Sequence, residues 1–252
     1  MVDLLQVYNL KKIFSGVAAL DGVSMTAEEG ATTLVIGPNG SGKTTLINVV
    51  TGIYKPDSGK VTFNGQDVQG LSPHRIYEAG MVRSFQIPLP FQGLTVLENL
   101  LTAYRKNPGE SFLRAPFHRM WLSKEKEVID FAFELLGLLK LEHLWNEKAS
   151  KLSGGQIKLL EIGRSLMSGA RMLLMDEPIA GVNPVLAHEI LGHTLDLKRK
   201  LGLTFLFVEH RLDVALQYVN NICVMDKGRI LSQGNPDDVM NDPRVIEAYL
   251  GG

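Results

Sequence analysis

The stretch that most constrains the fold is "TTLVIGPNGSGKTTLINVVTG", residues 32–52. An apolar run ends at Gly37, and a helical pattern begins at Lys43 and closes at Gly52. Between them, "GPNGSGKT" matches the pattern G-x-x-x-x-G-K-[ST]. Glycines let such a loop turn its N–H groups toward phosphate oxygens, and the following helix adds the positive end of its dipole. A chance glycine-rich turn would rarely lie between a strand and a helix, so the stretch predicts a phosphate-binding loop.

The chemistry of phosphates assigns roles within this loop. Lys43, a candidate catalytic residue, is expected to reach the β- and γ-phosphates of a nucleotide, and the Thr44 hydroxyl to ligate Mg²⁺. A nucleotide with Mg²⁺ is therefore the predicted ligand. The expected nucleotide-binding residues of the loop are Gly37, Pro38, Asn39, Gly40, Ser41, Gly42, Lys43, Thr44 and Thr45.

Further apolar strands alternate with helices. "RMLLMD" (171–176), "LTFLFVE" (203–209) and "NICVMD" (221–226) read as buried strands. A helix is expected after the first of them, with Asn183 as N-cap, Pro184 at its first position and Gly202 past its end. Continuous apolar strands separated by helices indicate a mostly parallel sheet covered on both faces. The predicted fold class is α/β, with a P-loop (RecA-like) core.

Two regions depart from this pattern. The N-terminal part and residues 60–64 read as antiparallel strands, which form a β subdomain of the core. Residues 87–150 lose strand signals and read as an inserted helical subdomain, in which Ser123 is expected to cap a helix. The apolar face of that helix is expected to contain Val128, Phe131, Leu135 and Leu138. The core is thus predicted over 1–86 and 151–252, with the insertion continuing into a helix over 153–168.

Composition narrows the class of protein. The net charge of −1 over 252 residues gives no basic field for nucleic acid. The N-terminus carries an acidic residue where a signal peptide needs a basic start, and no apolar run reaches the roughly 18 residues of a membrane span. The single cysteine, Cys223, excludes an internal disulfide and reads as a buried apolar residue. We expect a cytoplasmic protein.

"LLMDEP" (173–178) supplies acidic groups beside the phosphate loop. Asp176 ends a buried strand, and ligands bind at the carboxyl ends of strands in open α/β sheets. An aspartate there can hold Mg²⁺ through water, although it can also act only as a helix cap or turn former. Glu177 follows and can polarise a water molecule against the γ-phosphate, so it is the expected general base.

"LSGGQ" (152–156) places two glycines at a helix entrance. Ser153 is a suitable N-cap, and Gly154 and Gly155 leave backbone N–H groups bare at the positive end of the helix. That is a second anion site built like the first. One chain does not need two phosphate sites for one nucleotide, but two chains that share nucleotides do.

The P-loop, "LSGGQ" and "LLMDEP", in this order, resemble the ATPase subunit of an ABC transporter over essentially the whole chain. The resemblance implies a head-to-tail dimer, in which the "LSGGQ" of one chain completes the ATP site of the other. It therefore adds Ser153, Gly154, Gly155 and Gln156 to the expected nucleotide-binding residues. The partners that it implies are a second ATPase subunit, identical or paralogous, transmembrane permease subunits, and indirectly a substrate-binding protein. It places the chain on the inner face of the membrane.

Three further residues match motif positions of that family. Gln86 in "VRSFQIP" resembles the glutamine that contacts Mg²⁺ or water and reports nucleotide state, although it can be an ordinary loop residue. His210 resembles the switch histidine that contacts the γ-phosphate, although a lone histidine is often only structural. Phe14 resembles the aromatic residue that stacks on adenine, with Tyr8 as a competitor. The chain departs from many relatives at Asn183 and Arg211, which puts detailed contacts across the dimer in doubt.

Within the family, "VRSFQ", "LTVLENL", "DEPIAGVNP" and "VEHRLD" resemble the ATPase subunits of branched-chain amino acid importers. The lipopolysaccharide-export ATPase shares much of this pattern and stays an alternative. A soluble ABC ATPase that acts on nucleic acid is a second alternative, which near-neutral charge and a single cassette disfavour. A P-loop GTPase is disfavoured because the guanine-reading N-K-x-D motif is absent.

Overall fold

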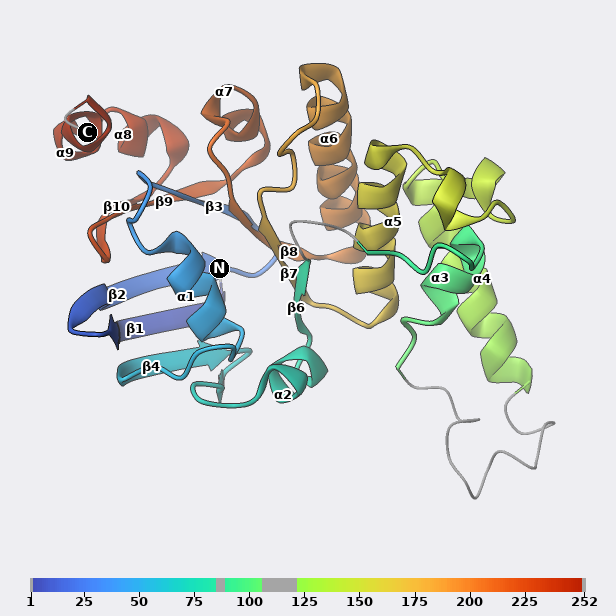
Figure 1. Ribbon diagram of the computed structural model, residues 1–252, viewed down its shortest axis with the longest axis horizontal. Coiled ribbons are helices and arrows are strands. Elements are labelled where there is room, and N and C mark those ends of the chain that lie inside the picture. Colours follow the sequence, from blue (N-terminus) through green and yellow to red (C-terminus); the bar gives the residue numbers. More distant parts are fainter. Residues whose placement is uncertain (1, 85–88, 106–121, 251–252) are drawn as a thin grey trace. The chain divides into compact units, whose positions relative to one another are not determined.

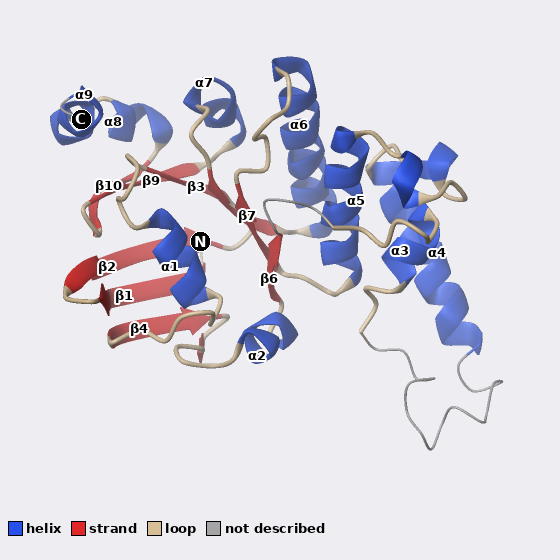
Figure 2. Cartoon of the chain, viewed as in Figure 1, coloured by secondary structure: helices blue, strands red, loops and turns tan. Residues whose placement is uncertain are grey.

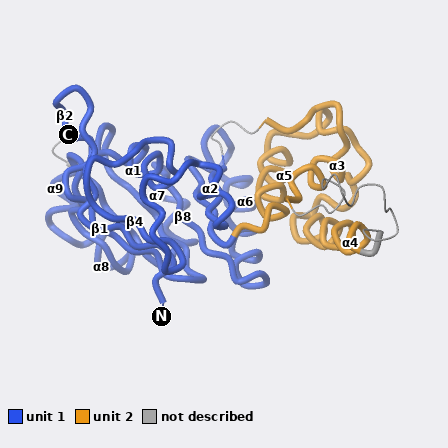
Figure 3. Tube along the Cα trace, turned by 90° about the horizontal axis from the view of Figure 1, so that it is seen from below, with its two compact units in different colours: residues 1–86, 171–252 blue, residues 87–170 orange. Residues whose placement is uncertain are grey.

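The computed structural model describes residues 2–84, 89–105 and 122–250. The chain divides into two compact units, coloured in Figure 3, and each is described by itself. Unit 1 contains residues 1–86 and 171–252, and unit 2 contains residues 87–170. The helix over 154–167 therefore belongs to unit 2. The sequence predicts an insertion that ends at residue 150, with this helix as its continuation.

Unit 1 contains an antiparallel sheet with the strand order β2-β1-β4-β5 (Figure 1). Its strands are β1 (Asp3–Phe14), β2 (Val17–Glu28), β4 (Ser58–Phe63) and β5 (Gln66–Asp67). Ser15 and Gly16 join β1 to β2, and both have positive φ, as a two-residue hairpin turn requires. The expected antiparallel β subdomain is thus present, and β4 covers most of residues 60–64.

The second sheet of unit 1 has the order β10-β9-β3-β8-β7-β6, drawn in red in Figure 2. Its strands are β3 (Thr32–Ile36), β6 (Met81–Ser84), β7 (Met172–Asp176), β8 (Thr204–Val208), β9 (Asn221–Asp226) and β10 (Arg229–Gly234). All of these strands pair in parallel except β10, which pairs antiparallel with β9. The prediction of an α/β P-loop fold with a mostly parallel sheet is confirmed.

The helices of unit 1 follow from local signals in the sequence. They are α1 (Lys43–Val50), α2 (Pro73–Glu78), α6 (Pro184–Leu201), α7 (Leu212–Ala215), α8 (Pro236–Met240) and α9 (Pro243–Leu250), with the 3-10 turn η5 (Leu216–Tyr218). The side chain of Asn183 accepts a hydrogen bond from the N–H group of Leu186, and Gly202 ends α6 in the left-handed region, as predicted. Apolar residues of both sheets and α1 share one buried cluster that fixes the loop between β3 and α1.

Unit 2 consists of α3 (Val96–Leu101), α4 (Leu122–Leu138), α5 (Gly154–Met167) and the 3-10 turns η3 (Glu142–Leu144) and η4 (Ala149–Lys151) within its described residues. A Cβ at Gly163 of α5 would come within 3 Å of the side chains of Leu100 and Leu139, so glycine permits this close packing. The helix α4 already includes Leu122, so the prediction of Ser123 as its N-cap is wrong.

The buried face of α4 differs in part from the predicted one. Ala132, Leu135 and Leu136 are buried, whereas Val128 and Phe131 are only half-buried. Across the described ranges, no helix combines the length and the apolarity that a membrane span needs.

Candidate nucleotide-binding site

The predicted phosphate loop connects β3 to α1. Gly37, Gly40 and Gly42 all have positive φ. A Cβ at Gly37 would collide with the carbonyl oxygen of Met225, and one at Gly42 with that of Ala19. Close backbone approach therefore requires glycine at both ends of the loop.

Lys43 is the first residue of α1, and its side chain folds back over the loop. Its Nζ atom donates to the carbonyl oxygens of Gly37 (2.8 Å) and Pro38 (3.0 Å) and lies 3.4 Å from the hydroxyl of Ser41. Burial lowers the pKa of Lys43, and the charges of Asp176 and Glu177 oppose that shift. The ammonium group is thus held in the loop, close to both carboxylates.

A phosphate chain fits this loop for two reasons. The N-cap of α1 is Gly42, which has no side chain to cap the first-turn N–H groups, so those groups point to the loop. Lys43 adds a buried positive charge at the same place. Thr44 and Thr45 lie in the first turn of α1, and Thr44 is exposed, so its hydroxyl is accessible to a metal ion beside the phosphates.

Asp176 ends β7 and pairs with a residue that the sequence analysis missed. Its Oδ2 atom lies 3.0 Å from Nη2 of Arg83 on β6, and both side chains are largely buried. Arg83 also donates to Oδ1 of Asn48 at 2.5 Å. Asn48 is one turn beyond Thr44 on α1. A fixed positive charge therefore connects the helix of the phosphate loop to the strand that carries the acidic pair.

Glu177 and His210 come together beyond the ends of two neighbouring parallel strands. Asp176 pairs with Val208 at the end of the β7–β8 ladder, and the N–H group of Glu177 donates to the carbonyl oxygen of Val208 (2.9 Å). Nε2 of His210 lies 3.4 Å from Oε1 of Glu177. Glu177 itself has a φ of 51°, which is uncommon for a residue with a Cβ.

Phe14 lies at the end of β1 and is 39 % exposed. Its ring packs edge-on against Tyr54 with a centroid separation of 5.2 Å, and Nζ of Lys12 lies 5.4 Å from its centroid. Tyr8, the competing aromatic residue, is 71 % exposed in the middle of the same strand. Tyr54 was not foreseen, because its contact with Phe14 joins residues 40 positions apart.

In unit 2, the "LSGGQ" segment starts α5. Ser153 is the N-cap: its hydroxyl accepts from the N–H group of Gln156, and the side chain of Gln156 accepts from the N–H group of Ser153. This capping box fixes the helix start and engages the side chains of both residues. Gly154 is exposed, and a Cβ at this position would meet nothing within 4 Å. Gln86, the remaining predicted site residue, lies outside the described residues.

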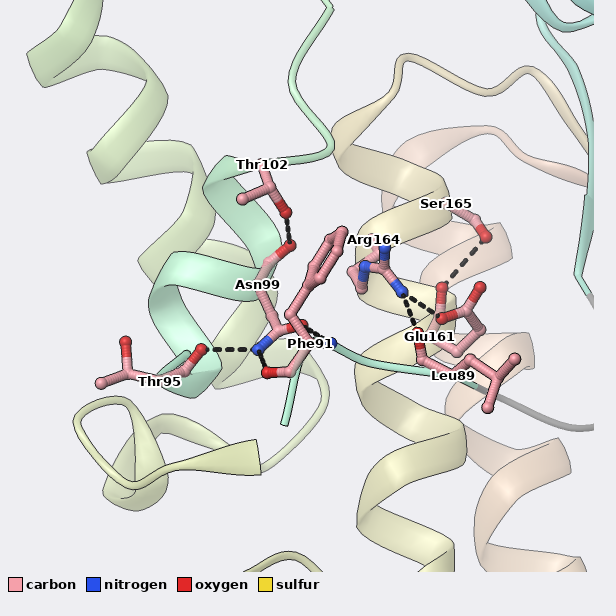
Figure 4. A network of polar contacts seen from close by, with 8 residues as sticks. All are labelled: Leu89, Phe91, Thr95, Asn99, Thr102, Glu161, Arg164 and Ser165. Atoms are coloured by element: carbon pink, nitrogen blue, oxygen red, sulfur yellow. Dashed lines mark hydrogen bonds and ion pairs between the residues drawn. The ribbon is translucent and has the colours of Figure 1, made fainter. Parts of the chain in front are cut away.

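A polar network in unit 2 holds the segment from Leu89 to Thr95 (Figure 4). Asn99 of α3 is fully buried; its Oδ1 accepts from the N–H group of Phe91, and its Nδ2 donates to the carbonyl oxygens of Phe91 and Thr95 at 3.0 and 2.9 Å. One amide side chain therefore forms hydrogen bonds with backbone groups at both Phe91 and Thr95, which hold this segment against α3.

Arg164 of α5 contacts the same segment. It donates to the carbonyl oxygen of Leu89 (3.4 Å), lies over the ring of Phe91 (5.2 Å) and pairs with Glu161 (2.8 Å). The residues that come directly after the segment of Gln86 are thus attached to the helix that begins with "LSGGQ".

The model of the family described as "ABC transporter" matches residues 20–180, which include the phosphate loop, "LSGGQ" and the acidic pair. The chain belongs to the ABC transporter family. Since the ATP-binding proteins of this family are ATPases coupled to transport, the chain is an ABC ATPase. A second model, described as "Branched-chain amino acid ATP-binding cassette transporter", matches residues 229–252.

Curated relatives of this ABC ATPase match over nearly their whole length. A probable branched-chain amino acid transport ATP-binding protein of Archaeoglobus fulgidus is 51 % identical, with 99 % of this chain and 96 % of the relative covered. A protein of the same description from Methanocaldococcus jannaschii is 50 % identical, with 99 % and 98 % covered.

A solved structure resembles the cassette equally closely. A crystal structure of the ADP conformation of an ATP-binding cassette of an ABC transporter is 49 % identical, covers 100 % of both chains and has a TM-score of 0.85.

Proposed function

We propose that this ABC ATPase is the ATP-hydrolysing subunit of a branched-chain amino acid importer and that it acts on Mg-ATP. The observation that carries the substrate class is the 51 % and 50 % identity, over 99 % of the chain, to relatives described as branched-chain amino acid transport ATP-binding proteins. The second family model, at residues 229–252, supports the same class over lipopolysaccharide export.

The geometry of unit 1 and the resemblance to the family support the roles proposed within this unit. Phe14 stacks on adenine, and residues 37–45 hold the phosphates through backbone N–H groups and Lys43. Thr44 and Asp176, together with Gln86, are the residues that would hold Mg²⁺, which when bound offsets phosphate charge. Glu177 accepts a proton from the attacking water, and His210 orients Glu177 and contacts the γ-phosphate.

The roles proposed for unit 2 need a second chain. Ser153, Gly154, Gly155 and Gln156 of one subunit contact the nucleotide held by the phosphate loop of the other. Two ATP molecules at the interface favour the closed dimer, and hydrolysis reopens it. The dimer acts on permease subunits from the cytoplasmic face of the membrane, indirectly with a substrate-binding protein and without nucleic acid.

Reconstitution tests the proposal. The chain is co-purified with its permease subunits and incorporated into liposomes, and uptake of radiolabelled leucine is followed in the presence of Mg-ATP and the binding protein. Uptake that requires ATP and is lost in Glu177→Gln supports the proposal. ATPase activity that responds to nucleic acid but not to permease subunits, or transport of lipopolysaccharide instead of leucine, would contradict it.

A further inference from the structure

Three consecutive residues after β8 contact the loop that follows β7. Glu209 accepts from the N–H group of Ile179, His210 lies beside Glu177, and Arg211 donates to the carbonyl oxygen of Val182. The distances are 2.8 Å from Ile179 N to Oε1 of Glu209, and 3.0 Å from Nη1 of Arg211 to the oxygen. Of these three residues, only His210 has a role in the proposed function.

Glu209 is an unusual residue for this position. Its side chain is 2 % exposed, and what holds its carboxylate is backbone: Oε1 accepts from Ile179 N, and Oε2 accepts from His210 N at 3.2 Å. Burial raises the pKa of Glu209, and these N–H groups oppose the shift. Buried carboxylates are costly and persist when backbone donors compensate them, so the side chain connects two loops at a definite distance.

Arg211 forms the second connection, at Val182, which lies three residues beyond Ile179 in the loop. The side chain of Arg211 is about two-thirds buried, and its guanidinium group donates to the carbonyl oxygen of Val182 and is 3.8 Å from Asp213. Val182 precedes Asn183, the N-cap of α6. The loop from Glu177 to Asn183 is thus attached near its beginning by Glu209 and near its end by Arg211.

We propose that Glu209 and Arg211 are positioning residues, which fix the loop 177–183 against His210 so that Glu177 and His210 keep their separation. The inference rests on the proposed roles of Glu177 and His210. Neither residue touches the reacting atoms. Each acts through the backbone of the loop, and Glu209 also through the N–H group of His210 itself. A displacement of about 1 Å at a reacting group can lower a rate about 100-fold.

The test uses Glu209→Gln and Arg211→Met in the full chain. Glutamine keeps the size of glutamate but turns an NH₂ group toward a backbone N–H, so that one of the two bonds at Ile179 and His210 is lost. We expect the amide that loses its acceptor, that of Ile179 or of His210, to exchange hydrogen about tenfold faster in the nucleotide-free variant. We also expect kcat to fall about 10- to 100-fold, with the Kd for ATP unchanged within about twofold.

Thr204→Val is the matched control. Thr204 lies at the other end of β8, where its hydroxyl accepts from the N–H group of Gly30 at 2.9 Å. The variant loses the same kind of bond, from a backbone N–H group to a side-chain oxygen, at the opposite end of β8 from the loop. We expect faster exchange at Gly30 and a lower Tm, with kcat unchanged.

The outcomes separate this inference from the proposed function. Faster exchange in the loop with an unchanged kcat, while Glu177→Gln is inactive, overturns the positioning role alone. Loss of activity in Thr204→Val equal to that in Glu209→Gln means that general destabilisation explains the effect. If the wild type hydrolyses no ATP, the proposed function fails. The exchange rates of the backbone amides still test whether Glu209 holds the loop 177–183. Arg211→Met, at a partly exposed side chain, provides the same test if Glu209→Gln does not fold.

Discussion

Nε2 of His210 lies 3.4 Å from Oε1 of Glu177, although the two residues are 33 positions apart. Glu177 directly follows β7, and His210 lies two residues beyond the end of the neighbouring parallel strand β8. The ladder between the two strands reaches Asp176 and Val208. Strand register therefore sets the separation of the two side chains to first order. The position of Glu177 at φ 51° shows that the backbone leaves the strand abruptly there, which turns its side chain toward the histidine.

Replacement of Glu177 by Gln is expected to lower ATP hydrolysis by about 10²- to 10⁴-fold, because the amide cannot accept a proton from water. Binding of ATP should persist, since the phosphate loop is unchanged. The variant is therefore expected to form a stable dimer with ATP, measurable by size-exclusion chromatography with light scattering. A variant that stays monomeric at saturating ATP would contradict the dimer mechanism.

Replacement of Lys43 by Ala is expected to abolish tight ATP binding. The ammonium group lies in the phosphate loop, 2.8 Å from the carbonyl oxygen of Gly37, and Lys43 is the one basic residue in the sequence of residues 37–45. Isothermal titration calorimetry with ATP measures the loss. Lys43→Arg is the matched control for charge, and an unchanged Kd in Lys43→Ala would refute the role of the lysine.

Local signals were enough to predict the elements that carry the site. The pattern G-x-x-x-x-G-K-T, the N-cap Asn183 and the terminal Gly202 each act through neighbouring backbone, so a few residues determine them. The strands β3 and β8 are buried at every position, as their apolar runs predicted. The start of α4 differs from the prediction: the helix includes Leu122, one residue before the expected cap Ser123.

Contacts between distant strands could not be predicted in the same way. Arg83 pairs with Asp176 only because β6 and β7 are neighbours in the sheet, and no local pattern encodes that order. The burial of Glu209 likewise depends on the loop after β7, which lies 30 residues earlier. The only sequence signal for Arg83 is a charged residue beside the apolar pair Met81 and Val82 in a short strand.

The thiol of Cys223 gives a pH dependence with a definite sign. Burial raises its pKa from 9.0 to about 12, so the folded state retains a proton that the unfolded state loses above pH 9. The resulting stabilisation is fully present below pH 9 and is lost as the pH rises toward 12. The difference in free energy of unfolding between the wild type and Cys223→Ala should therefore shrink from pH 8 to pH 10.5. Denaturant titrations at several pH values measure it, and a constant difference would contradict the burial.

Asn99 should contribute more to the stability of unit 2 than its size suggests, because one amide forms hydrogen bonds with four backbone groups (Figure 4). Replacement by Leu removes these bonds. The carbonyl oxygens keep backbone donors, since Phe91 O still accepts from Leu94 N and Thr95 O from Asn99 N. The N–H group of Phe91 loses its acceptor, at about 1–3 kcal/mol if it stays unsatisfied. Asn99→Asp is the sharper variant, since it keeps the shape and the acceptor for Phe91 but turns an oxygen toward carbonyl oxygens.

The two variants of Asn99 differ in their dependence on pH. A protonated carboxyl can still donate one hydrogen bond, whereas an ionised one cannot donate any. Asn99→Asp should therefore be destabilised more at pH 8 than at pH 5 relative to the wild type, and Asn99→Leu equally at both. Thermal unfolding at the two pH values provides the measurement. Equal losses for both variants at both pH values would show that Asn99 fills space and that its donor bonds to Phe91 and Thr95 add no stability.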